Sequence, residues 1–189
     1  YEKVKDKPLF AVIDCTGHGV PGAFMSIIGY TQLNEIVTQQ KTNDPGLILR
    51  ELDKRVKIAL NQNSLNGKNS KDGMELGLIN IDFEQNKLEF AGAMRPLYLV
   101  RQGELKIFKG SKFSIGGISR REKEFATSRI NILPGDSIYL FSDGYPDQFG
   151  GPNGKKFMTR NVADMLRSIS HLPMRSEERR VGKECRSRW

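Results

Sequence analysis

Two aspartates stand directly after apolar segments of the chain and are the first candidates for chemistry. Asp14 follows LFAVI at residues 9 to 13, and Asp143 ends the segment DSIYLFSD. A carboxylate at the end of a buried strand needs a partner that offsets its desolvation, and a divalent cation is one such partner. Oxygen donors without a His or Cys cluster favour Mg²⁺ or Mn²⁺ over zinc. We therefore predict a hard-cation site, to which Cys15 would add its backbone carbonyl.

The alternative for both aspartates is structural. Each carboxylate could accept a hydrogen bond from the backbone of the turn that follows it, as in Asx turns. For Asp143, which precedes Gly144, this alternative is favoured when the dipeptide is considered by itself.

Two further residues are candidates for substrate binding. His18 lies between two glycines and could protonate a leaving oxygen or touch phosphate, or it could be a plain loop residue in a turn shaped by those glycines. Arg95 could pair with phosphate bidentately, or it could be a solvated turn arginine before Pro96. For each residue taken alone, the structural alternative is favoured.

The elements that would position these residues begin with a strand at residues 9 to 14, whose apolar run is typical of a strand buried on both faces. A helix of about 18 residues is predicted from Pro21, because apolar residues recur with helical spacing and proline fits a first helical turn. A second helix is predicted from Asp44 and Pro45, a capping residue followed by proline.

Beyond residue 72 the apolar period is that of strands. The segments GMELGLINID, KLEFAGA, PLYLVR and ELKIF predict a meander of antiparallel strands. Two more strands, EFATSRINI and DSIYLFS, are joined by a Pro-Gly turn, and the second is predicted to end at Asp143. A last helix is predicted over residues 159 to 170. Helices beside runs of antiparallel strands predict an α+β layered domain.

Composition and charge limit the classes of function. The last fifteen of the 189 residues, 175 to 189, include nine charged ones and resemble a translated sequencing adapter. We predict that this segment is not native, although a native basic tail is the alternative. Without it, 24 basic and 19 acidic residues remain, too small and dispersed an excess to indicate nucleic-acid binding. Cys15 is then the sole cysteine, which favours a reducing cytoplasm, and no apolar run is long enough for a membrane span.

Four segments resemble SpoIIE-type phosphatases of the PPM (protein phosphatase 2C-type) superfamily. They are VIDCTGHGVPGAFMS, KDGMELGLINID, FAGAMRPLYLVR and LFSDGYPDQFGGPNGKKF, within residues 8 to 174. The resemblance implies an αββα sandwich of two antiparallel sheets flanked by helices, with metal ions at one edge between the sheets. It also implies hydrolysis of phosphoserine or phosphothreonine by a water that two Mn²⁺ or Mg²⁺ ions activate.

The resemblance also implies roles for individual residues. Asp14 matches the aspartate that bridges both ions, Cys15 contributes its backbone carbonyl, and Asp143 matches a further metal carboxylate. No phosphoenzyme is implied, so Cys15 is not expected to be a nucleophile. Asp72 and Asp147 match acidic positions of the family but are not assigned as ligands.

The family pattern includes an acidic residue upstream of this sequence and an Asp-Asp motif downstream of it. Residues 1 to 174 are therefore expected to form a partial domain of marginal stability, with little or no activity. The resemblance implies a bacterial sensor protein that acts on a phosphoprotein, such as an anti-sigma-factor antagonist. No nucleic-acid or membrane contact is expected of this segment. A homodimer would suit sensor-linked relatives. One alternative is a non-catalytic partner-binding module of the same fold. Another is a nucleic-acid-binding domain, suggested by the pI of 9.5, which loses most of its support when residues 175 to 189 are left out.

Overall fold

The structure is a computed structural model that describes residues 2–4, 7–40, 42–62, 72–119, 122–150 and 154–172. The chain divides into two compact units, each formed by two segments. The first unit comprises Tyr1–Leu97 and Phe108–Leu133, and the second comprises Tyr98–Ile107 and Pro134–Trp189. The polypeptide therefore leaves the first unit after Leu97, returns to it at Phe108 and leaves it again after Leu133.

The first unit is built on an antiparallel sheet with the strand order β1-β2-β3-β4-β8, to which the short β7 adds by pairing with β3. Strands β2 and β3 pair from Leu9 with Asn80 to Cys15 with Met74, so the end of β2 lies beside the start of β3. The strand bounds are β1 Glu2–Val4, β2 Lys7–Cys15, β3 Gly73–Asp82, β4 Lys87–Ala93, β7 Ile115–Gly116 and β8 Ser128–Asn131.

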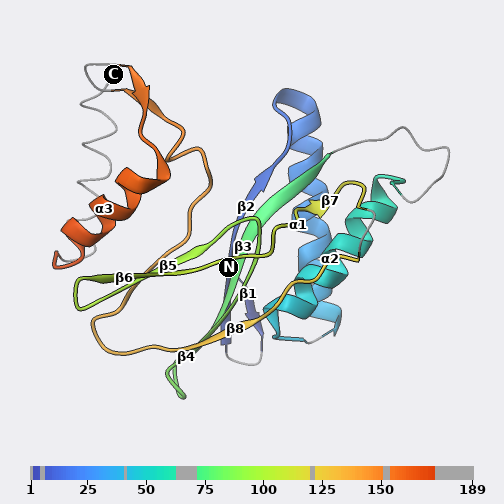
Figure 1. Ribbon diagram of the computed structural model, residues 1–189. Coiled ribbons are helices and arrows are strands. Elements are labelled where there is room, and N and C mark those ends of the chain that lie inside the picture. The colour runs from blue at the N-terminus through green and yellow to red at the C-terminus, as the bar shows by residue number, and fades with distance from the viewer. Residues whose placement is uncertain are drawn as a thin grey trace. The chain divides into compact units, whose positions relative to one another are not determined.

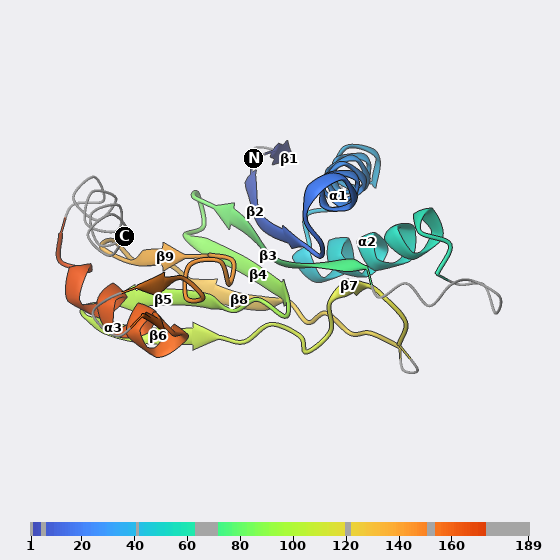
Figure 2. The same ribbon diagram turned by 90° about the horizontal axis from the view of Figure 1, so that it is seen from above.

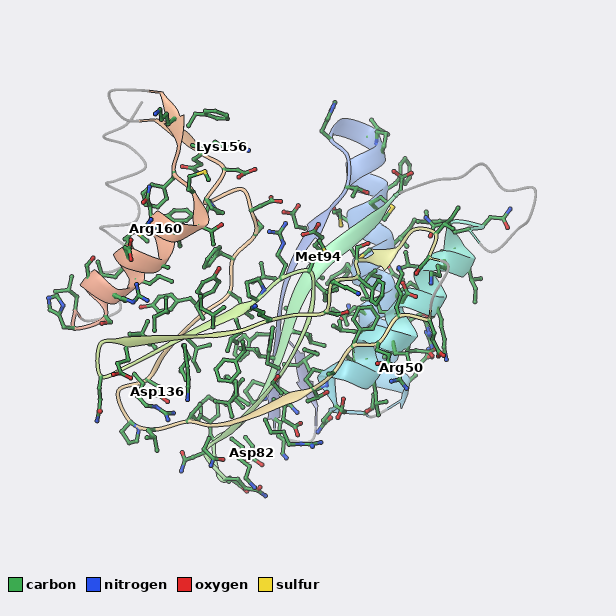
Figure 3. The ribbon with its side chains drawn as sticks, in the orientation of Figure 1. Arg50, Asp82, Met94, Asp136, Lys156 and Arg160 are labelled. Carbon is green, nitrogen blue, oxygen red and sulfur yellow. The ribbon has the colours of Figure 1, made fainter. Side chains whose placement is uncertain are left out.

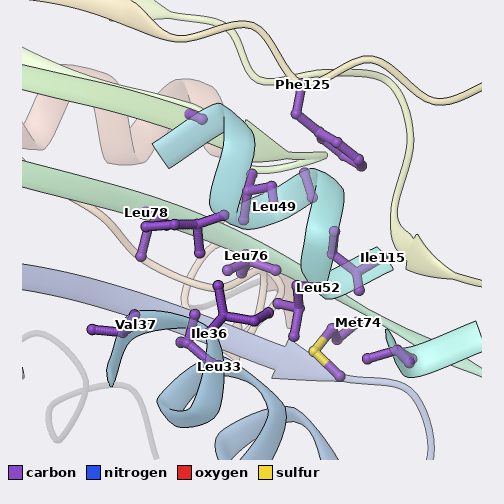
Figure 4. Packing of buried hydrophobic residues seen from close by; sticks show 14 of the residues in the cluster. Leu33, Ile36, Val37, Leu49, Leu52, Met74, Leu76, Leu78, Ile115 and Phe125 are labelled. Carbon is purple, nitrogen blue, oxygen red and sulfur yellow. The ribbon is translucent and has the colours of Figure 1, made fainter. Parts of the chain in front are cut away.

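Two helices, α1 (Gly19–Gln40) and α2 (Pro45–Ala59), lie side by side over one face of this sheet (Figures 1 and 2). Alternate residues of a strand point to the same face, and in β3 the alternate residues Met74, Leu76 and Leu78 are fully buried in the core with residues of both helices (Figure 4). This core holds β3 in place, and β3 in turn fixes the end of β2 that carries Asp14.

The start of α2 agrees with the sequence prediction. Asp44 is its N-cap, and the Asp44 carboxylate oxygen Oδ1 accepts hydrogen bonds from the backbone nitrogen of Leu47 at 3.0 Å and from the Thr127 hydroxyl at 2.6 Å. Pro45 occupies the first helical turn, where its missing N–H would have no helical partner. The cap therefore also ties α2 to the segment that leads into β8.

We expect Asp44→Ala to lower the free energy of unfolding by about 1–2 kcal/mol, because it removes the cap of α2. Asp44→Asn is the matched control, since its amide oxygen can still accept both hydrogen bonds, and it should stay close to the parent protein. Urea denaturation followed by circular dichroism measures both variants. Equal stabilities for Asp44→Ala and Asp44→Asn would show that the cap contributes nothing.

A buried charge cluster joins α2 to β7. Asp53 on α2 and Lys123 are 6% and 7% exposed, and their side chains pair at 2.9 Å. The Asp53 carboxylate also accepts the backbone N–H of Gly116 at 2.9 Å and pairs with Lys57 at 2.6 Å. Lys123 donates further hydrogen bonds to the carbonyl oxygens of Ser114 and Gly116. Burial lowers the pKa of the Lys123 ammonium, and Asp53 opposes this shift.

The second unit contains a three-stranded sheet of order β6-β5-β9, a short hairpin of β10 and β11, and the helix α3. Apolar residues of α3 pack with aromatic residues of this unit, among them Tyr98, whose ring stacks on Phe141 with centroids 4.8 Å apart. The bounds are β5 Leu97–Arg101, β6 Glu104–Phe108, β9 Ser137–Tyr139, β10 Phe149–Gly150, β11 Lys155–Lys156 and α3 Thr159–Ile169.

The α+β class predicted from the sequence is confirmed: both units have antiparallel sheets with helices beside them. The predicted meander is wrong between β4 and β5, because β5 joins a different sheet, where it pairs with β6 and β9. Its β3–β4 and β5–β6 pairings are confirmed. In the segment EFATSRINI only Ser128–Asn131 is a strand.

Two predictions about strands that carry aspartates need correction. Strand β2 is not buried on both faces, since Phe10 is 38% exposed and the residues from Val12 to Cys15 are only partly buried. Strand β9 ends at Tyr139 rather than at Asp143. None of the helices in the described part of the chain combines the length and hydropathy that a membrane span requires.

Candidate functional site

Asp14 lies near the end of β2, directly opposite Glu75 of β3 in the antiparallel register. Side chains of directly opposed residues lie on the same face of a sheet, a few ångströms apart. Both carboxylates are partly exposed, at 34% for the Asp14 side chain and 31% for that of Glu75. Two like charges in this position repel each other, so the pair needs a cation nearby.

Arg95 supplies a positive charge to this pair. Its Nη2 atom lies 2.9 Å from Glu75 Oε2 and 3.4 Å from Asp14 Oδ2. The Arg95 side chain is only 12% exposed, which contradicts the interpretation of this residue as a solvated turn arginine. The candidate site therefore consists of two carboxylates, contributed by neighbouring strands, and one guanidinium from the segment that follows β4.

The backbone before Arg95 is tightly constrained. Met94, labelled in Figure 3, has a φ of 64° in the left-handed region, and its backbone nitrogen donates to the carbonyl oxygen of Ser111 at 2.8 Å. A Cβ atom added at Gly92 or at Gly110 would collide with the carbonyl oxygen of Arg95, so both glycines permit a close backbone approach. The bend at residues 94 and 95 is thus set by the fold rather than by the arginine side chain.

The segment just after Asp14 is fixed to β3 by hydrogen bonds. The backbone nitrogen and the hydroxyl of Thr16 both donate to the carbonyl oxygen of Gly73 at 3.0 Å, and the Gly73 nitrogen donates to the Thr16 hydroxyl at 2.9 Å. Gly73 also pairs with Gly116 of β7, the strand that the Asp53 cluster holds. The backbone on either side of Cys15 is therefore supported from α2 through β7 and β3.

Cys15 is the last residue of β2, and its side chain is partly buried. Burial raises the pKa of the Cys15 thiol, a hydrogen bond with Ser26 opposes this, and the nearby charge of Asp14 adds to it. A raised pKa disfavours the thiolate, which is the nucleophilic form. The predicted contribution of its backbone carbonyl to a metal ion stays a prediction.

His18 is exposed in the loop that leads into α1. Gly17 and Gly19 beside it have φ values of 94° and 62°, which L-residues with a side chain rarely adopt. The glycines therefore shape this turn, as the structural alternative proposed. Substrate contact by His18 stays a prediction.

Asp143 is exposed and lies in the second unit, in the turn that follows β9. Its carbonyl oxygen accepts the backbone N–H of Asp147 at 2.8 Å, and the Asp147 carboxylate pairs with Lys156 at 2.8 Å. Asp14 and Asp143 belong to different compact units, so their shared site stays a prediction.

The donors around Asp14 suit a hard cation chemically, because the candidates are carboxylate and carbonyl oxygens. Among the residues that the structure describes, no group of three or more His, Cys, Asp or Glu side chains converges on one point. The carboxylates of Asp14 and Glu75 could contribute to such a site, and Arg95 contacts both.

Glu75 was not among the residues singled out from the sequence. A signal was available, because it is the only charged residue inside the otherwise apolar or amide-bearing run of β3 before Asp82. A charge at such a position, opposite an aspartate of the neighbouring strand, indicates a functional or ion-paired role. The register that makes them neighbours becomes visible only in the folded chain.

Comparison with protein families gives a match to the family described as Stage II sporulation protein E (SpoIIE), over residues 5–186. Comparison with curated protein sequences gives no match. Among solved structures, the SiaA-PP2C domain of Pseudomonas aeruginosa is 30% identical with a TM-score of 0.84, and the match covers 97% of this chain and 70% of that one.

Two more distant structures share the fold. The RsbU and RsbW domains of a Mycobacterium tuberculosis protein match with 20% identity and a TM-score of 0.64, over 87% of this chain and 43% of that one. The PP2C phosphatase domain and regulatory fragment of SpoIIE from Bacillus subtilis match with 18% identity and a TM-score of 0.62, over 88% of this chain and 44% of that one. This chain thus spans less than half of the length of these two.

Proposed function

We propose that this chain, which belongs to the SpoIIE family of PP2C-type phosphatase domains, is part of a metal-dependent phosphoprotein phosphatase. Its substrates would be phosphoserine and phosphothreonine of a protein partner in bacterial signalling. The observation that carries the proposal is the carboxylate of Asp14, which stands half-exposed at the end of β2 with its backbone fixed to β3 through Thr16 and Gly73.

In this proposal Asp14, the carbonyl of Cys15 and Asp143 would hold Mn²⁺ or Mg²⁺. Bound ions of this kind neutralise the phosphoryl oxygens and activate the attacking water. The protein's own part is positioning: the Thr16–Gly73 hydrogen bonds fix the direction of the chain after Asp14, and the core under β3 keeps that strand from moving. His18, in the loop before α1, and Arg95, in the segment after β4, are proposed as substrate contacts.

The biological setting of the protein is proposed from the similar structures. One similar structure is described as containing RsbU and RsbW domains, and another contains a fragment of a regulatory domain. We propose an anti-sigma-factor antagonist as the phosphoprotein substrate, a sensor domain in the natural protein, a homodimer as its oligomeric state, and the cytoplasm as its location. We also propose that residues 175 to 189, which lie outside the described part of the chain, are not native.

A second candidate is a non-catalytic signalling module of the same fold that binds a partner without turnover. The observation that favours it is the arginine itself, because Arg95 contacts both Asp14 and Glu75 and so gives these carboxylates a cation from within the chain. The guanidinium offsets part of the negative charge of the two carboxylates, and this reduces the need for a metal ion.

Phosphopeptide hydrolysis distinguishes these two candidates. We expect the natural protein that carries this sequence to release phosphate from phosphoserine and phosphothreonine peptides, to stop when EDTA is added, and to resume with excess Mn²⁺. A phosphotyrosine peptide of the same sequence is the substrate control. A protein that binds Mn²⁺ but releases no phosphate would support the non-catalytic module, and release unaffected by EDTA would refute the metal-dependent mechanism.

A further inference from the structure

Arg95 contacts the carboxylate that the proposed function assigns to metal binding. We propose that the Arg95 guanidinium competes with divalent cations for Asp14 and thereby sets the concentration at which the site fills. This inference rests on the proposed function, since it assumes that Asp14 is a metal ligand. Arg95 would then be an internal counter-ion that regulates how readily Asp14 binds a metal ion.

The contacts support competition because one carboxylate serves both cations. The guanidinium Nη2 lies 3.4 Å from Asp14 Oδ2, within ion-pair distance. A divalent cation on the same carboxylate would lie within a few ångströms of this positive charge, and like charges at that range repel. Both side chains are partly buried, at 12% exposure for Arg95 and 34% for Asp14, so solvent and salt screen the repulsion only in part.

The backbone places Arg95 at this position independently of its side chain. Met94 adopts a φ of 64°, which is uncommon for a residue with a side chain. Gly92 and Gly110 both approach the Arg95 carbonyl oxygen so closely that neither could carry a Cβ atom. The Met94 nitrogen donates to Ser111, and Ala93 forms a bridge with the same residue. The backbone at residues 92 to 94 is thus fixed, and it carries Arg95 to its place beside Asp14 and Glu75.

Glu75 is the positioning residue for the guanidinium. Its oxygen is the nearer of the two, at 2.9 Å from Nη2 compared with 3.4 Å for Asp14. When a divalent cation takes Asp14, Glu75 can keep the arginine paired and nearby. Without Glu75, Arg95 would lose the nearer of these two carboxylates, and more of its charge would act on Asp14. Changing Arg95 and changing Glu75 should therefore shift metal affinity in opposite directions.

The test is Mn²⁺ binding by the natural protein, followed by the electron paramagnetic resonance signal of free Mn²⁺. We expect Arg95→Met to lower the dissociation constant about tenfold, the factor that corresponds to ~1.4 kcal/mol of relieved repulsion. Arg95→Lys keeps the charge and should remain closer to the parent. Arg167→Met is the matched control, because Arg167 pairs with Asp164 on the exposed face of α3 in the second unit, at 2.9 Å.

Glu75→Gln completes the cycle. It should weaken Mn²⁺ binding more when Arg95 is present than in the Arg95→Met background, where only the loss of its own negative charge acts. Equal weakening in both backgrounds would overturn the positioning role. Unchanged or weaker binding by Arg95→Met would overturn the competition.

Phosphopeptide hydrolysis and Mn²⁺ binding together separate the competition by Arg95 from the phosphatase activity. If the parent protein hydrolyses phosphopeptides with Mn²⁺ but Arg95→Met binds the ion no more tightly, the competition is wrong and the phosphatase proposal stands. If neither the parent nor Arg95→Met binds Mn²⁺, both are wrong.

Discussion

Asp14→Ala should reduce the Mn²⁺-dependent hydrolysis of p-nitrophenyl phosphate by the natural protein about 10²–10³-fold or more, the loss typical of removing a group that stabilises transition-state charge. Asp14 lies at the end of β2 with its neighbours fixed by the Thr16–Gly73 hydrogen bonds. Its removal should therefore delete a ligand without moving the backbone. The expected loss is in kcat, with the fold retained by circular dichroism.

Asp164→Ala is the control for this loss. Asp164 is also acidic and exposed, it lies on α3, and its carboxylate pairs with Arg167. Its removal costs an exposed ion pair, which contributes little, and activity should stay close to that of the parent. Comparable losses in Asp14→Ala and Asp164→Ala would mean that the assay reports general damage, and the role of Asp14 would be refuted.

The largest effect on stability is expected at the buried cluster between α2 and β7. Asp53→Ala should lower the free energy of unfolding by about 3–5 kcal/mol, because it leaves the ammonium of Lys123 without its carboxylate in a buried position. It also removes the acceptor of the Gly116 backbone N–H. Lys54→Met, an exposed lysine of the same helix, should change the free energy by no more than about 0.5 kcal/mol.

The double variant Asp53→Leu with Lys123→Met separates the charge from the packing. Replacing both members of a buried ion pair by apolar side chains is often neutral, so this protein should be more stable than Asp53→Ala. Urea denaturation measures all three variants. A double variant less stable than Asp53→Ala would show that the cluster acts through its shape rather than through paired charge.

Local signals in the sequence were sufficient for the helices and for the pairs of neighbouring strands β3–β4 and β5–β6. The capping residue Asp44 and the following Pro45 gave the start of α2 correctly, because a cap and its helix are adjacent in the chain. The turn between β3 and β4 was equally local, with the Asp82 carboxylate accepting the backbone N–H of Gln85 at 2.9 Å. In both cases the interacting groups lie within a few residues of each other.

Strand partners were not predictable in the same way. The apolar pattern of PLYLVR is the same whether it continues a meander or joins another sheet, and β5 pairs with β9, from Tyr98 with Tyr139 to Val100 with Ser137. The pattern of DSIYLFS also does not show where the strand stops. Phe141 stacks on Tyr98 from outside the strand, so its apolar character reflects packing in the second unit.

The sequence alone identified Asp14 and Arg95 as candidate site residues, but it identified neither their contact nor Glu75. Asp14 was identified because it follows an apolar strand, which is a local feature. The ion pair between Arg95 and Asp14 joins residues 81 positions apart, and Glu75 completes the group only through the register of β2 and β3. Such contacts follow from strand pairing, which residue spacing does not encode.

The proposed metal-dependent hydrolysis requires the carboxylates of both Asp14 and Asp143, and it is tested by comparing Asp14→Ala, Asp143→Ala and the double variant in Mn²⁺-dependent hydrolysis of p-nitrophenyl phosphate. We predict that both single variants lose activity and that the double variant is no worse than the weaker of them, because groups that act as a unit are not additive. Full activity in Asp143→Ala would contradict the claim. So would a natural protein that neither binds Mn²⁺ nor hydrolyses the ester.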